Sequence, residues 1–204
     1  MAFIRTIPPE QASEALRSMY ERQRAHFGYL PNDAMVFCYR PEVMAAWAAL
    51  IGCIRKHVEP RRFELVTLSA AHALENTYCA LAHGKALAEL MDAEDIPAIV
   101  NGGQPRGLSA AEHEIVRLAR KVARDARSVS AGDIARLRDC GLSDAEIFDV
   151  VAVTAGRAFF TKILDGLGAD ADPVYLEMAA PLRHALTVGR PVPGTPPADG
   201  RTAA

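Results

Sequence analysis

A thiol and an imidazole lie four residues apart, as Cys79 and His83, in the stretch ELVTLSAAHALENTYCALAH. Four residues are about one helical turn, so the two side chains face each other on one side of a helix. A cysteine attacks peroxides or disulfides as the thiolate, which requires a proton acceptor and a positive field. If Asn76 caps the helix, Cys79 falls in the first turn, where the helix dipole favours negative charge. The spacing therefore predicts a reactive thiol at Cys79, with His83 as its proton acceptor.

Glu64 is a third candidate for this site. On an unbroken helix, positions 64 and 79 would differ by about 60° in azimuth, so the two side chains could share one side. A carboxylate there would fix the tautomer of His83 and raise its basicity. We therefore expect Glu64 to point inward at His83. The alternatives are a solvated first-turn acid at Glu64, a partly exposed imidazole at His83 and an inert buried thiol at Cys79.

This segment resembles the active-site signature of the carboxymuconolactone decarboxylase superfamily, on its alkylhydroperoxidase D-like side. That signature reads Glu, eleven residues, Cys-x-x-Cys, three residues, His, and Glu64, Asn76, Cys79 and His83 fall on its four positions in order. Asn76 stands where the family has its first cysteine, so only the second thiol of the pair remains. The flanks FGYLPNDAMVFCYRPEVMAAWAAL and GLSDAEIFDVVAVTAGRAFFTKILDGLG also resemble peroxidase-related members. The resemblance covers roughly residues 1 to 180.

The resemblance implies a peroxidase with antioxidant, peroxiredoxin-type activity. Cys79 would attack a hydroperoxide, while His83 and Glu64 relay protons. No cysteine fills the resolving role, so an external thiol reductant would have to reduce the oxidised Cys79. Alternatively, Cys53 or Cys140 could resolve it if its Cα atom lies within roughly 6 Å of that of Cys79. Two alternatives stay open: a non-redox lyase that uses the His83 and Glu64 pair on a small organic acid, and a non-catalytic binding or thiol-sensing oligomer.

Three polar residues near the thiol are candidates for binding substrate: Tyr78, Asn76 and His72. Tyr78 could donate a hydrogen bond to substrate, although a tyrosine at the edge of the core is the other interpretation. His72 lies on one helical stripe with the rest of the site, at spacings of four, three and four through Asn76, Cys79 and His83. Such a stripe could hold zinc, but structural zinc sites more often recruit paired cysteines. We therefore expect no metal and no cofactor.

Helix signals run along nearly the whole chain. Prolines open helices at Pro8-Pro9, Pro41, Pro60 and Pro173, and capping boxes open two more at Ser109-Glu112 and Ser143-Glu146. A shorter helix is expected over residues 130–139. No segment shows the period-two alternation of a strand, so we predict an all-α, single-domain helical bundle over residues 1–187. The tail at residues 188–204 is rich in Pro and Gly and is expected to be disordered on its own.

Composition narrows the possible partners. The formal net charge of -2 and the interleaving of arginines with acids give no basic face for nucleic acid. No stretch reaches the ~18 to 20 apolar residues of a membrane span, and the start lacks a secretory signal, so we expect a cytoplasmic protein without a membrane partner. The four scattered cysteines suit reduced thiols. Two very apolar helices, near residues 43–54 and 155–167, offer more buried face than one small layer can cover, which predicts a homo-oligomer.

Overall fold

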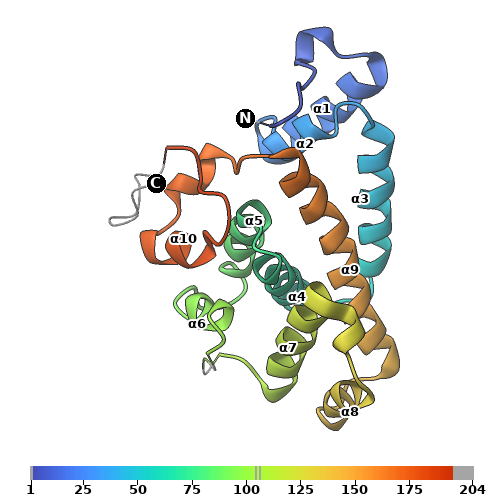
Figure 1. Cartoon of the computed structure of the whole chain (residues 1–204), viewed down its shortest axis with the longest axis vertical. Coiled ribbons are helices and arrows are strands. Elements are labelled where there is room, and N and C mark those ends of the chain that lie inside the picture. Colours follow the sequence, from blue (N-terminus) through green and yellow to red (C-terminus); the bar gives the residue numbers. More distant parts are fainter. Residues whose placement is uncertain (1, 104, 106, 195–204) are drawn as a thin grey trace.

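The computed structural model describes residues 2–103, 105 and 107–194, and no strand occurs among them (Figure 1). The all-α prediction is therefore confirmed. The longer helices are α1 (Glu14–Phe27), α3 (Pro41–Arg55), α4 (Pro60–Ala73), α5 (Thr77–Leu87), α7 (Ala110–Asp125), α8 (Ala131–Asp139) and α9 (Asp144–Leu167). The shorter ones are α2 (Asn32–Val36), α6 (Ile96–Val100) and α10 (Ala180–Leu186), with 3-10 turns at Pro9–Gln11, Ala126–Ser128 and Pro173–Glu177.

Helix α4 is the centre of the bundle, and α5, α7 and α9 pack around it (Figure 1). It begins where the Glu59 side chain accepts hydrogen bonds from the N–H groups of Arg61 and Arg62, with Pro60 in the first turn. From Phe63 to Ala71 every residue of α4 is buried. A helix covered on all sides positions its few polar side chains rigidly, because they have no solvent-facing alternative.

A sharp break separates α4 from α5. Glu75 adopts the left-handed region, with φ of 58°, and Asn76 follows it in an extended conformation. The Asn76 Oδ1 atom accepts the Cys79 N–H at 2.7 Å, while its Nδ2 donates to Asp165 Oδ1 of α9 at 2.8 Å. The predicted cap is confirmed, and Cys79 lies in the first turn of α5.

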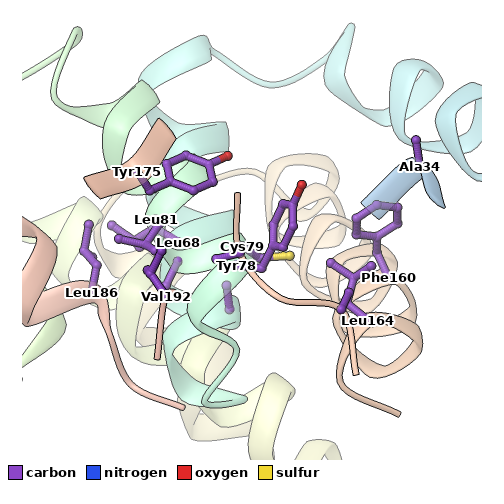
Figure 2. Packing of buried hydrophobic residues seen from close by; sticks show 14 of the residues in the cluster. Ala34, Leu68, Tyr78, Cys79, Leu81, Phe160, Leu164, Tyr175, Leu186 and Val192 are labelled. Carbon is purple, nitrogen blue, oxygen red and sulfur yellow. The ribbon is translucent and has the colours of Figure 1, made fainter. Parts of the chain in front are cut away.

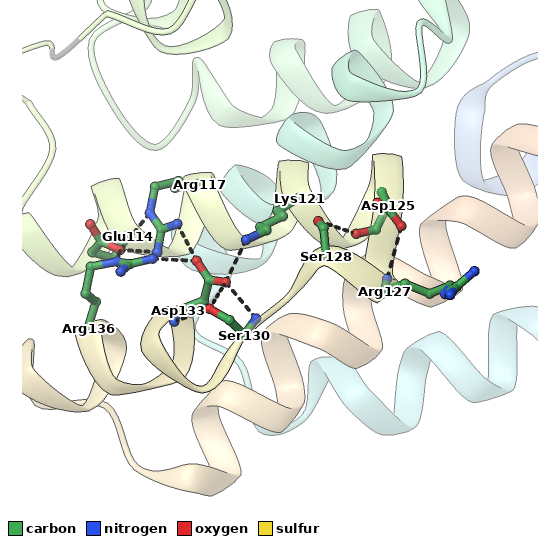
Figure 3. Close-up of polar contacts among 9 residues, drawn as sticks. All are labelled: Glu114, Arg117, Lys121, Asp125, Arg127, Ser128, Ser130, Asp133 and Arg136. Carbon is green, nitrogen blue, oxygen red and sulfur yellow. Dashed lines mark hydrogen bonds and ion pairs between the residues drawn. The ribbon is translucent and has the colours of Figure 1, made fainter.

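Serine capping boxes fix the starts of three helices. Those at Ser109 and Ser143 begin α7 and α9, as the sequence predicts, and a third at Ser130 begins α8. The third box continues into an ion-pair cluster between α7 and α8 around the buried Asp133 (Figure 3). Asp133 accepts from Arg117 Nη1 and Lys121 Nζ, each at 2.7 Å, and from Arg136. This cluster, which we call the Asp133 clasp, ties α8 to α7.

Two proline-led helices are shorter than predicted. Pro9 opens only a 3-10 turn, and α1 begins at Glu14 behind Ser13. Pro173 likewise opens a 3-10 turn, and the last α-helix begins at Ala180. Proline sets the backbone angle of a first turn but does not supply the run of residues that propagates a helix.

The apolar sequence of helix α3 suggested that it is buried on most sides, but in the single chain it is not. In the single chain it packs along α9, and its opposite face is exposed, with Leu50 at 54%. The exposed apolar side chains of this helix are Ala45, Ala46, Ala48, Ala49, Leu50 and Cys53. One chain places little else against α3, so its apolar outer face has no cover within it.

Residues 188–194 pack against the bundle, so the expectation of a disordered tail is wrong for them; residues 195–204 lie outside the described part of the chain. Val192 is only 1% exposed, and the Gly189 N–H donates to Thr77 Oγ1 at 2.9 Å. A Cβ atom at position 189 would lie 2.0 Å from the Glu75 carbonyl oxygen. The segment therefore approaches the start of α5 more closely than any residue but glycine allows.

Among the described residues, none of the helices is both long and apolar enough to cross a membrane.

Candidate active site

Glu64 of α4 and His83 of α5 form a hydrogen-bonded pair, as predicted. The Glu64 Oε2 and His83 Nδ1 atoms are 2.6 Å apart, and the Glu64 side chain is almost fully enclosed. The other carboxylate oxygen, Oε1, lies 3.8 Å from Arg55 Nη2 of α3. Burial opposes ionisation of Glu64, but the bond to His83 and the charges of Arg55 and Arg157 prevail and hold its pKa below the usual range.

The imidazole of this pair is arranged to act as a base. Burial lowers the pKa of His83, and the nearby Arg157 charge lowers it further, although Glu64 opposes both effects. The ring is therefore neutral at neutral pH. With Glu64 ionised, Nδ1 carries the proton and donates to the carboxylate, which leaves Nε2 as the acceptor.

Cys79 is 2% exposed and lies in the main core cluster (Figure 2). Its Sγ atom accepts a hydrogen bond from Arg157 Nη1 at 3.6 Å, whereas no bond between Cys79 and His83 is found in the described part of the chain. Burial raises the pKa of the Cys79 thiol to about 11, and Arg157 only partly offsets this. The Cys79 thiol is therefore protonated at rest, because desolvation outweighs the field of the helix start and of Arg157.

Arg157 of α9 also belongs to this site, although the spacing of residues in the sequence did not predict it. It is 5% exposed, and its guanidinium carbon lies 5.3 Å from the Trp47 ring centroid and 5.5 Å from that of Phe160. Its Nε atom is buried and finds no hydrogen-bond partner among the described residues. The available signal was a single charge in the run from Val150 to Thr161, which is otherwise uncharged. A buried arginine with an unused donor marks a site built for negative charge.

Tyr78 holds its hydroxyl in a hydrogen-bond network and does not present it freely to substrate. The Oη atom donates to Asp172 Oδ2 and accepts the Asp33 N–H at 3.3 Å. Tyr29 Oη also donates to Asp172 Oδ2, at 3.2 Å. The predicted role of Tyr78 as a substrate-binding residue stays a prediction, now with the hydroxyl engaged at rest.

Asn76 and His72 are placed differently from each other. Both amide atoms of Asn76 are used, one in the cap and one on Asp165, so Asn76 supports the helix start. His72 lies toward α7 and α10: burial and the charge of Arg120 lower its pKa, and its Nε2 atom is buried without a hydrogen-bond partner among the described residues. The break at residues 74–76 interrupts the stripe that would have joined His72 to Cys79. No group of three potential metal ligands occurs within the described ranges.

The remaining cysteines are free thiols. Cys53 is exposed on α3, and Cys140 packs against a second core cluster that does not include Cys79. Cys38 is buried and accepts the Ile7 N–H at 3.4 Å. The chain itself therefore provides Cys79 with no disulfide partner in the described structure.

The site is closed in this structure. Aromatic and aliphatic side chains from α5, α9, the Pro173–Glu177 turn and the segment around Val192 surround the thiol (Figure 2). Those labelled in the figure include Tyr78, Phe160, Leu164, Tyr175 and Val192. A substrate reaches Cys79 only when part of this cover moves.

No protein-family model matches the sequence, and no curated protein matches it. Solved structures do resemble the fold. A peroxidase-related protein from Ralstonia eutropha, described as an alkylhydroperoxidase AhpD core, superposes with a TM-score of 0.72 at 17% identity, over 93% of this chain and 98% of its own. The chain has the AhpD-like helical fold.

Two further structures share the AhpD-like fold. One is a peroxidase-related protein from Silicibacter sp., with a TM-score of 0.71 at 19% identity, over 81% of this chain and 89% of its own. The other is the debrominase Bmp8 in complex with 2,3,4-tribromopyrrole, with a TM-score of 0.71 at 14% identity, over 90% of this chain and 95% of its own. Since one neighbour is named a debrominase and the other two only peroxidase-related, the shared fold leaves the chemistry to be argued from the site.

Proposed function

We propose that the protein is a thiol-dependent peroxidase in which Cys79 attacks a hydroperoxide. One observation carries the proposal: a buried guanidinium, that of Arg157, lies 3.6 Å from the Cys79 sulfur beside the Glu64–His83 pair. A cation next to the thiol lowers the free energy of the thiolate at the moment of attack. The AhpD-like fold of peroxidase-related proteins supports the same activity.

The reaction begins with removal of the thiol proton. His83 Nε2 takes it, directly or through a water molecule or the substrate itself, and Glu64 stabilises the imidazolium. The sulfur of Cys79 attacks the terminal oxygen of the hydroperoxide; an S–O bond forms, the O–O bond breaks and an alkoxide leaves. The thiol is oxidised to a sulfenic acid, the peroxide is reduced, and protonation of the alkoxide gives the alcohol.

The oxidised thiol must be reduced from outside the chain. Asn76 occupies the place of a resolving cysteine, and no other thiol of the described chain pairs with Cys79. We propose that a small external thiol forms a mixed disulfide with Cys79 and that a second thiol molecule releases it.

The high pKa of Cys79 favours a second candidate. A thiol with a pKa of about 11 behaves as a small hydrophobe, and the Glu64–His83 pair could then act alone as acid and base. In that case the protein is a non-redox lyase for a small organic acid, whose carboxylate would pair with Arg157. The lyase requires no sulfur at position 79.

Substitution of the nucleophile separates the two candidates. We expect Cys79→Ser to abolish hydroperoxide consumption in the presence of a thiol reductant, because a hydroxyl is a far poorer nucleophile at neutral pH. Mass spectrometry with a sulfenic-acid trap should find the adduct on Cys79 in the parent. Cys140→Ser is the matched control, because the Cys140 thiol packs against the second core cluster, and this variant should retain hydroperoxide turnover. Peroxide turnover by Cys79→Ser would refute the peroxidase.

A further inference from the structure

Two carboxyl groups lie beside Tyr78, and they differ in how well they are satisfied. Asp172 accepts three hydrogen bonds, from Tyr78 Oη, from Tyr29 Oη at 3.2 Å and from the Asn32 N–H at 2.9 Å. Asp33, at the start of α2, donates a hydrogen bond from its backbone N–H to Tyr78 Oη at 3.3 Å. Its Oδ1 atom is buried and has no hydrogen-bond partner among the residues that the structure describes.

This asymmetry assigns different protonation states to the two acids. Asp172 has the donors that a buried carboxylate requires, so it is the better place for negative charge. A second ionised carboxylate nearby would be repelled and poorly solvated. Accordingly, burial, together with the charge of Asp172, raises the pKa of Asp33 to about 7. Asp33 therefore carries a transferable proton in about half of the molecules at pH 7, and in more of them below it.

Asp33 is also near enough to Cys79 for its charge to act on the thiol. Tyr78, which accepts its N–H, directly precedes Cys79 in α5. The charges of Asp33 and Arg157 both act on the Cys79 thiol, in opposite directions, and Arg157 in turn acts on Asp33. The unpartnered Asp33 Oδ1 and Arg157 Nε atoms are thus two unused polar groups around one thiol.

We propose that Asp33 is a further catalytic residue, the general acid that protonates the alkoxide leaving group. The inference rests on the proposed peroxidase function. His83 accepts the thiol proton, and Asp33 donates its carboxyl proton to the alkoxide as the O–O bond breaks. The products are the sulfenic acid, an alcohol, an imidazolium and an ionised Asp33, so protons and charge balance; both groups then re-equilibrate with solvent. Arg157 stabilises the transient negative charge on the alkoxide and on Asp33.

The titration of Asp33 depends on every ionisable group that faces it. These groups are Asp172 and Tyr175 from the Pro173–Glu177 turn and its N-cap, Tyr78 and Cys79 from α5, Tyr29 from the loop before α2, and Arg157 from α9. The tyrosines stay neutral because burial raises their pKa values. Near pH 7 Asp33 is therefore the member of this cluster that changes charge.

The test compares the pH dependence of hydroperoxide reduction in the parent, D33N and D139N. D33N keeps the shape of the side chain and removes the proton, whereas D139N makes the same chemical change on an exposed residue at the end of α8. In the parent and in D139N, kcat/KM should fall as the pH rises through about 7, because the acid loses its proton. D33N should be about 100-fold slower at pH 6 and should lack this fall. Infrared difference spectra should show the carbonyl band of a protonated carboxyl in the parent and not in D33N.

Each outcome bears on the proposal. A D33N enzyme with parental kcat/KM and an unchanged pH profile overturns the role of Asp33 and leaves the peroxidase standing. A parent that reduces no hydroperoxide refutes the peroxidase, and the general acid falls with it. If D33N does not fold, D33E replaces it in the test. D33E keeps a carboxyl group, so its kcat/KM should still fall as the pH rises through about 7. If kcat/KM stays constant through about pH 7 in both D33E and the parent, the assignment of Asp33 is overturned.

Discussion

Two opposing electrostatic effects meet at the sulfur of Cys79. Burial disfavours the thiolate, and the Arg157 guanidinium at 3.6 Å favours it, with burial the larger effect. A pKa of about 11 leaves about one thiol in 10⁴ ionised at pH 7. A thiol in this state resists adventitious oxidation, and its reaction depends on a base acting together with the substrate. That requirement gives the Glu64–His83 pair its role.

Removal of the guanidinium should make the thiol still harder to ionise. We expect Arg157→Met, which is apolar and of similar length, to raise the pKa of Cys79 beyond about 11 and to slow its alkylation at least about tenfold, since a close opposite charge shifts a pKa by about 1 to 3 units. Arg157→Lys keeps the charge and should recover part of the rate. Alkylation of Cys79 by iodoacetamide, followed by mass spectrometry across pH, measures both. Equal rates of Cys79 alkylation in Arg157→Met and the parent would show that the Arg157 charge does not stabilise the thiolate.

The sequence predicted the contacts that lie along one helix or across one tight break. The Asn76 cap, the position of Cys79 in the first turn and the Glu64–His83 contact all follow from spacing within residues 64–83. Arg157 and Asp33 come from α9 and α2, which are brought to the site by packing. No local periodicity encodes such a contact, so spacing could not find them. The same limit explains why the raised pKa of the Cys79 thiol could not be predicted, because the degree of burial is set by the whole bundle.

Side-chain caps decide where the helices begin, and ion pairs hold neighbouring helices together. Serine capping boxes are local signals, and the two that the sequence predicted are confirmed. The Asp133 clasp combines such a box with a contact between helices, which the sequence alone did not reveal (Figure 3). Its carboxylate is buried but fully engaged by cations, so loss of its charge would remove the counter-ion of Lys121 and leave Arg117 and Arg136 to share Glu114.

We expect Asp133→Asn to lower the melting temperature more than Asp144→Asn does. Asp144 is the matched control, since its pair with Arg138 at 2.7 Å is largely exposed and exposed pairs contribute little. The contacts of Asp133 depress its pKa, so its charge stabilises the fold above the unfolded pKa of ~3.9 and loses this effect as the pH falls below it. The difference between parent and Asp133→Asn should therefore be largest near pH 7 and shrink in acid. Thermal unfolding followed by circular dichroism at several pH values measures it; equal melting temperatures for the two variants at pH 7 would contradict the role of the clasp.

The apolar outer face of α3 has no cover within one chain. The sequence of this helix reads as buried on most sides, whereas Leu50 and, on the neighbouring α9, Phe159 are exposed at 54% and 45% (Figure 1). The apolar sequence and the exposed face agree if a second copy of the chain covers this face. Sequence composition reflects burial in the whole assembly, whereas a single chain shows only the burial within itself. We therefore propose that the protein is a homo-oligomer that assembles through α3.

A charge placed on this face should dissociate the assembly. At micromolar concentration we expect light scattering to give the parent a multiple of the 22.0 kDa chain mass and Leu50→Glu the mass of a single chain. Burying a leucine at an interface contributes about 1.5 to 3 kcal/mol, and a two-fold interface uses each substituted position twice, so the dissociation constant should rise by about 10² to 10⁴. Leu90→Glu is the matched control, because Leu90 is also exposed, at 42%, but lies beyond the end of α5. Its oligomeric state should not change. A parent of single-chain mass, or a Leu50→Glu variant that keeps the parental mass, would show that α3 is not the interface.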